Sequence, residues 1–140
     1  MAIKFHPQRG AMLMCDFTNA FKPPEMVKKR PVIVISPRSR RKSGLCTVVP
    51  ISTKEPVLIE KHHVKIDSGY LPPSPFFQGH NNQYWVKCDM IYRVAFHRLD
   101  LIRIGKSKNR KYYNELIPSE LLACITEGVI HSIGAGYLLK

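Results

Sequence analysis

Short apolar runs rich in β-branched residues follow one another along most of this chain, and only its last stretch carries a helical pattern. Such runs predict β-strands, because branched side chains fit a pleated surface. Pro31 is expected at the start of its strand and Pro50 at a bulge or an edge, because proline donates no ladder hydrogen bond. The expected strands are Ala11–Phe17, Pro31–Ser36, Leu45–Ser52, His63–Asp67, Tyr84–Asp89, Ile91–Phe96 and Leu99–Ile104.

One helix is expected after Pro118, a residue that suits the first helical turn. Its apolar stripe recurs at helical spacing, and Gly134 ends it. The stripe consists of Leu121, Leu122, Ile125, Val129 and Ile133. Several short strands followed by one helix predict a mainly β fold, with a helix packed on a small, strongly curved antiparallel sheet or barrel. The length of 140 residues suits a single domain over residues 1–140.

The formal net charge of +12 is concentrated in two parts of the chain. Residues 1–45 carry +8 and residues 90–114 carry +6, whereas residues 46–89 are neutral and residues 115–140 carry −2. Two basic segments around a neutral, apolar centre indicate a polyanionic partner, with solvated basic loops as the alternative. No apolar run approaches the roughly 18 residues that span a bilayer, and the N-terminus lacks the apolar core of a secretion signal. We therefore expect a cytoplasmic protein without membrane association.

Familiar cofactor and hydrolase motifs are missing from the sequence. It holds no GxGxxG, P-loop, HExxH or GxSxG pattern and no CxxC pair. No carboxylate cluster suited to two divalent metals is present. His62 and His63, as adjacent strand residues, should point to opposite faces and not share a metal. Neither a metal nor a cofactor is therefore expected.

Polar residues at the ends of the expected strands would suit metal-independent RNA cleavage. In RNA the 2′-OH attacks the adjacent phosphate, and the protein supplies a base, an acid and cations for the charge that develops on the phosphorane. An arginine fork suits the phosphate. The alternatives are an ordinary strand-end contact for Arg30, a turn role for Ser52 and a surface ion pair between Lys87 and Asp89.

Three segments of the chain resemble the PemK/MazF toxins of bacterial type II toxin–antitoxin systems. The arginine-proline strand and the strand end Val-Pro-Ile-Ser-Thr, in that order and spacing, are the most specific part of the resemblance. The segments are Arg9-Gly10 with Glu25–Pro37, then Lys42–Thr53, and finally Val86–Asp89 followed by Arg98–Asp100 and the helix Glu120–Gly134.

The resemblance implies a small SH3-like barrel of the CcdB/PemK/MazF type with a C-terminal helix, assembled as a homodimer. It implies an endoribonuclease, an mRNA interferase, that cuts single-stranded mRNA at short sequences without metal and forms a 2′,3′-cyclic phosphate. It also implies an acidic antitoxin whose C-terminal segment fills the RNA groove.

Carried over by motif, Arg30 acts on the scissile phosphate and Ser52 forms a hydrogen bond there. Lys87 and Asp89 match the Arg-Cys-Asp strand end that supplies acid and base in the PemK branch, with lysine in place of that arginine. Bases would stack on Phe76, Phe77 or Tyr84, and Trp85 could join them, although core packing is its expected role. Further RNA contacts are expected from Lys28, Lys29, Arg38, Arg40, Arg41, Thr53 and residues 106–111.

Two non-enzymatic alternatives stay open at this point. A toxin of the CcdB branch has the same fold and poisons DNA gyrase by protein contact. A plain basic RNA-binding module would also explain the charge.

Overall fold

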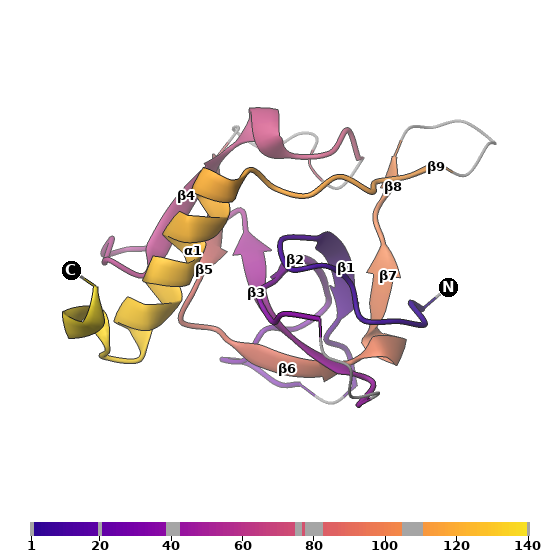
Figure 1. Ribbon diagram of the computed structural model, residues 1–140, viewed down its shortest axis with the longest axis horizontal. Helices are drawn as coiled ribbons and strands as arrows, with labels where there is room; N and C mark the ends of the chain where they lie inside the picture. Colours follow the sequence, from indigo (N-terminus) through magenta and orange to yellow (C-terminus); the bar gives the residue numbers. More distant parts are fainter. Residues whose placement is uncertain are drawn as a thin grey trace.

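The computed structural model describes residues 2–19, 21–38, 43–74, 77, 83–104 and 111–139. They form a strand-rich body with one α-helix along its side (Figure 1). The strands are β1 (Met12–Asp16), β2 (Lys29–Val34), β3 (Leu45–Ser52), β4 (His63–Asp67), β5 (Gln83–Lys87), β6 (Tyr92–Ala95), β7 (Leu99–Leu101), β8 (Arg103–Ile104) and β9 (Lys111–Tyr112). The helix is α1 (Ser119–Ser132), and single 3₁₀ turns are η1 (Ser68–Tyr70), η3 (Phe96–Arg98) and η4 (Gly136–Leu138).

Seven strands form one antiparallel sheet in the order β4-β5-β3-β2-β1-β7, and β6 pairs with the first half of β3. The separate pair β8–β9 is a short hairpin. The expected mainly β fold with a C-terminal helix is confirmed. The expected closure into a barrel is wrong, because β4 and β7 end the sheet and do not pair within the described residues. β7 has only three residues, and α1 packs against β4, so a helix rather than a strand covers that end.

Two cores lie on the two faces of the sheet, because successive strand residues point to opposite sides. On β2, Ile33 enters the core under α1, whereas Val32 and Val34 enter the core on the other face. We call these the helix-side core and the far-side core. The helix-side core consists of Met12, Ile33, Val49, Ile51, Ile66, Tyr84, Val86, Cys88, Ile102, Ile117 and Ile125, and the far-side core of Leu13, Cys15, Phe17, Val32, Val34, Cys46, Val48, Val94 and Leu99.

The helix buries most of its expected stripe. Ile125 is fully buried, and Leu121, Leu122 and Val129 pack against the helix-side core. Ile133 is 67% exposed, so its expected place in the stripe is wrong. The helix ends at Ser132, which leaves Ile133 beyond the last turn that packs on the sheet. No helix of the described residues is long and apolar enough to cross a membrane.

Two prolines stand where β2 and β3 stop pairing. The paired residues end at Val32 and Pro50, although β2 continues back to Lys29 and β3 continues to Ser52. Pro31 is therefore the third residue of its strand, so its expected position at the start of the strand is wrong. Pro50 lies opposite a bulge between β5 and β6, which agrees with its expected position. The Ile35 N–H donates to the Thr47 carbonyl, so alternate residues from Ile35 back along β2 turn their backbone groups toward β3, and Pro31 is one of them. Pro31 has no N–H to donate to β3, which stops the β2–β3 ladder without ending either strand. We call the unpaired stretch beyond Val32 and Pro50 the β2–β3 seam.

The chain bulges between β5 and β6, which confirms the break expected near Asp89. Residues 87–91 separate the paired Val86 and Tyr92, whereas only residues 49 and 50 separate their partners Ile51 and Val48. The longer side must loop out of the sheet. This places residues 87–91 on a bulge opposite Pro50.

Close packing on α1 fixes that bulge. A Cβ built on Gly128 would lie 2.8 Å from the Cys88 Sγ and 3.4 Å from the backbone oxygen of His62. The Ser132 hydroxyl donates to the Cys88 carbonyl at 3.2 Å. Glycine at position 128 therefore lets the helix approach the bulge and the turn before β4 closely.

Candidate functional site

Arg30 and Ser52 stand on the two sides of the β2–β3 seam. Each lies two residues beyond the last paired position of its strand, so each points to the same side as Val32 and Pro50. This is the face of the far-side core. Ser52 pairs in turn with Trp85 of β5. Arg30, Ser52 and Trp85 thus form a row across three strands on this face.

Two buried N–H groups without partners flank Ser52. The Arg30 Nε and the Trp85 Nε1 are shielded from solvent and have no hydrogen-bond partner in the part of the chain that the structure describes. An unmet buried donor costs about 1–3 kcal/mol. The Ser52 Oγ accepts the Lys54 N–H at 3.1 Å and keeps its own proton to donate. This row of donors on one face suits an anion.

Lys87 and Asp89 lie next to that row. Lys87 ends β5 two residues after Trp85, so it points to the same side of the strand. Burial lowers the pKa of Lys87; the nearby Asp89 carboxylate raises it, and Lys54 lowers it further. Asp89 follows in the bulge and is exposed. Asp89 therefore lies close enough to Lys87 to act on its charge.

Two histidines that the sequence analysis set aside join this pair. β4 pairs with β5 so that His63 lies directly opposite Lys87. The His62 Nε2 is 3.5 Å from the Asp89 Oδ2 and 3.3 Å from the Glu60 Oε2. The expectation that the histidines point apart is wrong. His62 precedes β4 and lies in a turn, and the two ring centroids are 4.2 Å apart. The histidine doublet was the available signal, but only strand pairing reveals what it faces.

The cluster of His62, His63 and Asp89 has the dimensions of a metal site, but a hydrogen bond to His63 occupies the lone pair that a metal ion would need. Ligand atoms of His62, His63 and Asp89 all lie within 4.8 Å of one another. However, the His63 Nδ1 accepts the Glu60 N–H at 3.0 Å. The proton of the neutral ring is then on Nε2, and no lone pair stays free for an ion. His63 is therefore arranged as a hydrogen-bond donor rather than a metal ligand.

The expected RNA-binding residues that the structure describes are exposed or half-buried. Lys28 and Lys29 are exposed where β2 begins, and Thr53 follows Ser52 half-buried. The Arg38 Nε donates to the His6 carbonyl at 3.1 Å. Arg40, Arg41 and residues 106–110 lie outside the described residues.

The aromatic side chains near the site pack inward. Trp85 is only 4% exposed, which agrees with its expected role in packing. Tyr84 is fully buried and meets Phe77 edge-on, with ring centroids 5.4 Å apart. The expected stacking of bases on Tyr84 is therefore wrong for this conformation. Phe76 lies outside the described residues.

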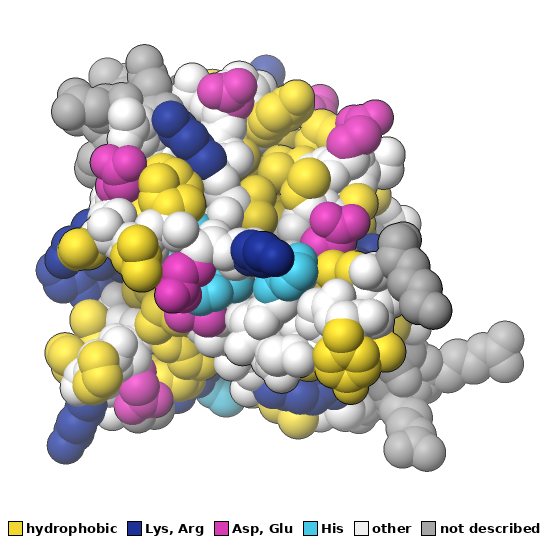
Figure 2. Space-filling view, turned by 90° about the vertical axis from the view of Figure 1, so that its left-hand side faces the viewer, with side chains coloured by type: hydrophobic (Ala, Val, Ile, Leu, Met, Phe, Trp, Pro, Cys, Tyr) yellow, Lys and Arg dark blue, Asp and Glu magenta, His cyan; other side chains and the backbone are white. Residues whose placement is uncertain are grey.

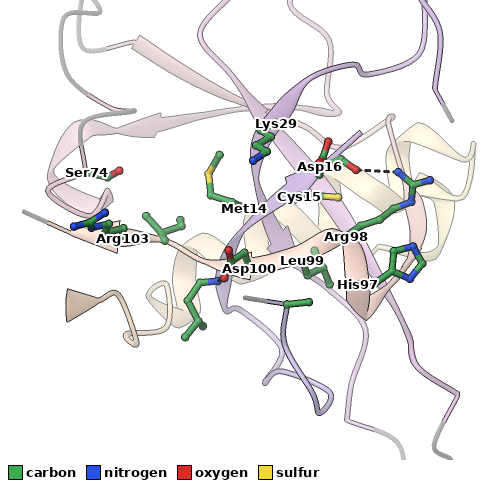
Figure 3. A pocket seen from close by; sticks show the side chains of 13 residues that line it. Met14, Cys15, Asp16, Lys29, Ser74, His97, Arg98, Leu99, Asp100 and Arg103 are labelled. Carbon is green, nitrogen blue, oxygen red and sulfur yellow. Dashed lines mark hydrogen bonds between the residues drawn. The ribbon is translucent and has the colours of Figure 1, made fainter. Parts of the chain in front are cut away.

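A pocket of about 720 Å³ lies beside β1 and β7 (Figure 3). Lys29 lines it and Arg30 does not. The Arg98 Nη1 donates to the Asp16 carbonyl at 2.9 Å at its rim. The lining carries both signs of charge, including Asp16 and Asp100, so we do not place the anion there.

Ionic side chains gather on the side of the molecule that carries β4 and the C-terminal end of α1. Figure 2 shows histidine, acidic and basic groups side by side on this face, among exposed apolar groups. The exposed large apolar residues just before β4 are Val57, Leu58 and Ile59, and those of η4 are Tyr137 and Leu138.

Comparison with known proteins gives one consistent result. Residues 8–125 match the family described as PemK-like, MazF-like toxin of type II toxin-antitoxin system. The chain is 34% identical to the Escherichia coli K12 protein YifN, with 100% of both chains covered. It is 31% identical to a Haemophilus influenzae Rd protein, with 99% of both covered.

Solved structures share the fold. MazF from Deinococcus radiodurans has a TM-score of 0.62 at 17% identity, covering 94% of this chain and 99% of that chain. A mycobacterial endoribonuclease in complex with its cognate antitoxin has a TM-score of 0.59 at 16% identity, covering 92% and 96%. At these identities the likeness shows the architecture alone.

Proposed function

Because this chain belongs to the PemK-like, MazF-like toxins of type II toxin–antitoxin systems, we propose that it is a metal-independent, sequence-selective endoribonuclease. Its substrate is single-stranded mRNA, whose unstacked bases can be read. The observation that carries the proposal is the pair of buried N–H groups, from Arg30 and Trp85, that flank Ser52 without partners among the described residues. A phosphate above Ser52 would supply the missing acceptors, once the side chains shift to admit it.

The reaction uses the ribose 2′-OH as nucleophile. Asp89 takes the proton of the 2′-OH, either directly or by orienting a water, as the oxygen attacks phosphorus. Arg30 and Ser52 donate to the oxygens of the phosphorane, where negative charge grows. Lys87 gives its proton to the departing 5′-oxygen as the P–O bond breaks. The products are a 2′,3′-cyclic phosphate and a 5′-hydroxyl end.

The lowered pKa of Lys87 supports its role as the general acid, with Asp89 as the base. Burial lowers the pKa of the ammonium group and so brings it closer to neutral pH, where a general acid works best. The neighbouring Asp89 is exposed and can accept a proton from substrate. Lysine cannot form the bidentate contact of an arginine, so Arg30 supplies the fork on the phosphate.

We also propose an acidic antitoxin partner and a homodimer. One solved relative is an endoribonuclease with its cognate antitoxin, and another is a MazE-MazF pair from Deinococcus radiodurans. The basic segments 1–45 and 90–114 would attract an acidic chain as they attract RNA. Antitoxin and RNA would then compete for one surface.

The test is cleavage of a long RNA by the purified protein in the presence of EDTA. We expect fragments with cyclic phosphate and 5′-hydroxyl ends, and we expect Arg30→Ala to lower the rate by about 10²–10³-fold. Arg93→Ala is the matched control, because Arg93 is exposed on β6 and donates a hydrogen bond to the Thr47 hydroxyl.

The outcomes separate the alternatives. RNA that stays intact over a broad range of sequences would refute the nuclease. If intact RNA is nevertheless bound, as reported by fluorescence of the single tryptophan Trp85, the protein is an RNA-binding module. Equal loss of activity in the Arg30 and Arg93 variants would show a general charge effect instead of a site.

A further inference from the structure

A histidine stands beside the proposed catalytic pair with its hydrogen bonding already arranged. His63 is half-buried at the start of β4, directly opposite Lys87 of β5. Because paired residues on antiparallel strands point to the same face, its ring shares the side of Lys87, Trp85 and Ser52. No motif in the sequence assigns this position a role.

Two hydrogen bonds join His63 to Glu60: one fixes the backbone of the turn, and the other fixes the ring and selects its tautomer. The backbone N–H of His63 donates to the Glu60 carbonyl at 3.0 Å, and the ring nitrogen Nδ1 of His63 accepts the backbone N–H of Glu60 at 3.0 Å. A ring that accepts at Nδ1 carries its proton at Nε2 when neutral. The group that points away from this turn is therefore an N–H donor.

The surroundings keep that ring neutral. Burial lowers the pKa of His63, and His62 and Lys87 lower it further, whereas the carboxylates of Asp89 and Glu60 act in the opposite direction. Protonation would also place a second N–H against the Glu60 N–H and break the bond at Nδ1. A neutral imidazole that donates to a reacting oxygen is an established way to stabilise developing negative charge.

We propose that His63 is a further catalytic residue of this site, donating its Nε2–H to a non-bridging oxygen of the scissile phosphate alongside Lys87. The inference rests on the proposed nuclease function. In the attack step the phosphorane oxygens gain charge, and a fixed donor stabilises them without moving a proton. His63 on β4 thus adds a donor to the one that Arg30 supplies from β2.

Two variants, each of which replaces one ring nitrogen of His63, separate the donor role of Nε2 from the role of Nδ1 in the turn. His63→Asn keeps an acceptor near the Nδ1 position for the Glu60 N–H but has no group at Nε2. His63→Gln reaches the Nε2 position with an amide N–H and cannot titrate. The same two substitutions at His97, an exposed histidine of η3 outside the site, are the matched controls.

The experiment measures single-turnover cleavage of one RNA between pH 5.5 and 8, together with binding of its 2′-deoxy analogue. We expect His63→Asn to slow cleavage by about 10²–10³-fold with unchanged binding of the analogue. We expect His63→Gln to stay within about tenfold of the natural protein and to keep the shape of its pH profile. Thermal unfolding of both variants verifies that the turn is intact.

Each contrary result has a distinct meaning. If His63→Asn cleaves as fast as the natural protein, His63 has no catalytic role, while the nuclease proposal stands. If His63→Gln is as slow as His63→Asn and loses one limb of the pH profile, His63 transfers a proton and the neutral-donor role is wrong. Absence of cleavage by the natural protein would refute the proposed function and this role together.

Discussion

Replacing Gly128 with alanine tests whether the helix positions the candidate site. A Cβ at this position would lie 2.8 Å from the Cys88 Sγ, 3.2 Å from the Cys88 Cβ and 3.4 Å from the His62 oxygen. Cys88 is fully buried and lies between Lys87 and Asp89, so its sulfur has little room to turn away. The added methyl must therefore push the bulge or the helix.

The expected stability change is a balance of two effects. Overpacking a core costs about 1–3 kcal/mol, and alanine gains about 1 kcal/mol over glycine inside a helix. Gly128→Ala should therefore lower the free energy of unfolding by about 0–2 kcal/mol. In a Cys88→Ala background the closest contact is gone, so the same substitution should be neutral or stabilising by up to about 1 kcal/mol.

Urea unfolding of the four proteins in this double-mutant cycle, followed by Trp85 fluorescence, measures the coupling between Gly128 and Cys88. RNA cleavage should fall in Gly128→Ala and recover in the double variant, because the bulge carries Lys87 and Asp89. Gly69→Ala is the control, since its Cβ would meet no atom within 4 Å. If Gly128→Ala stabilises both backgrounds equally and cleaves normally, the close contact does not position the site.

Two further predictions concern titration and thiol chemistry. The folded-state pKa of His63 lies below its ordinary value of 6.5, so the unfolded chain binds more protons than the folded protein as pH falls below about 6.5. In urea titrations between pH 7 and 5, the free energy of unfolding of the natural protein should therefore drop relative to that of His63→Gln. Parallel curves for the two proteins would contradict this prediction. Cys124 is exposed, whereas Cys15, Cys46 and Cys88 are buried with their pKa values raised by burial to about 12, 11 and 12. A thiol reagent at pH 8 should therefore label one cysteine in the folded protein and four after denaturation, and Cys124→Ser should leave none in the folded protein.

The strands were predictable wherever local pattern decides the structure. Leu45–Ser52 and His63–Asp67 form strands with the expected bounds, because their apolar and β-branched residues suit a sheet whatever the partner is. Pro31 was misplaced because the rule for proline concerns N–H donation, and a strand can continue through a proline whose N–H position faces no partner. Open edges were equally hidden, since whether β4 meets β7 depends on where α1 packs.

The candidate site was predictable in part for the same reason. Arg30, Ser52, Lys87 and Asp89 could be chosen from motifs at strand ends, and the sheet places them on neighbouring strands. His63 could not be placed, because its role depends on the pairing of β4 with β5 across a long connection. Alternation along a strand gives the side on which a residue lies, but it does not give the neighbour that it faces.

The prolines at the β2–β3 seam link the fold to the proposed chemistry. Had Pro31 been a residue with an N–H, the ladder could have continued past Val32 toward Arg30 and Ser52. With the ladder stopped, β2 still pairs with β1 through Arg30, and β3 still pairs with β5 through Ser52. Arg30 is therefore positioned by β1 and Ser52 by β5, while the facing edges of β2 and β3 stay unpaired at these two residues. In the proposed function, a phosphate that enters between them would displace no backbone hydrogen bond of the β2–β3 ladder, so only side chains would have to move for the donors to meet it.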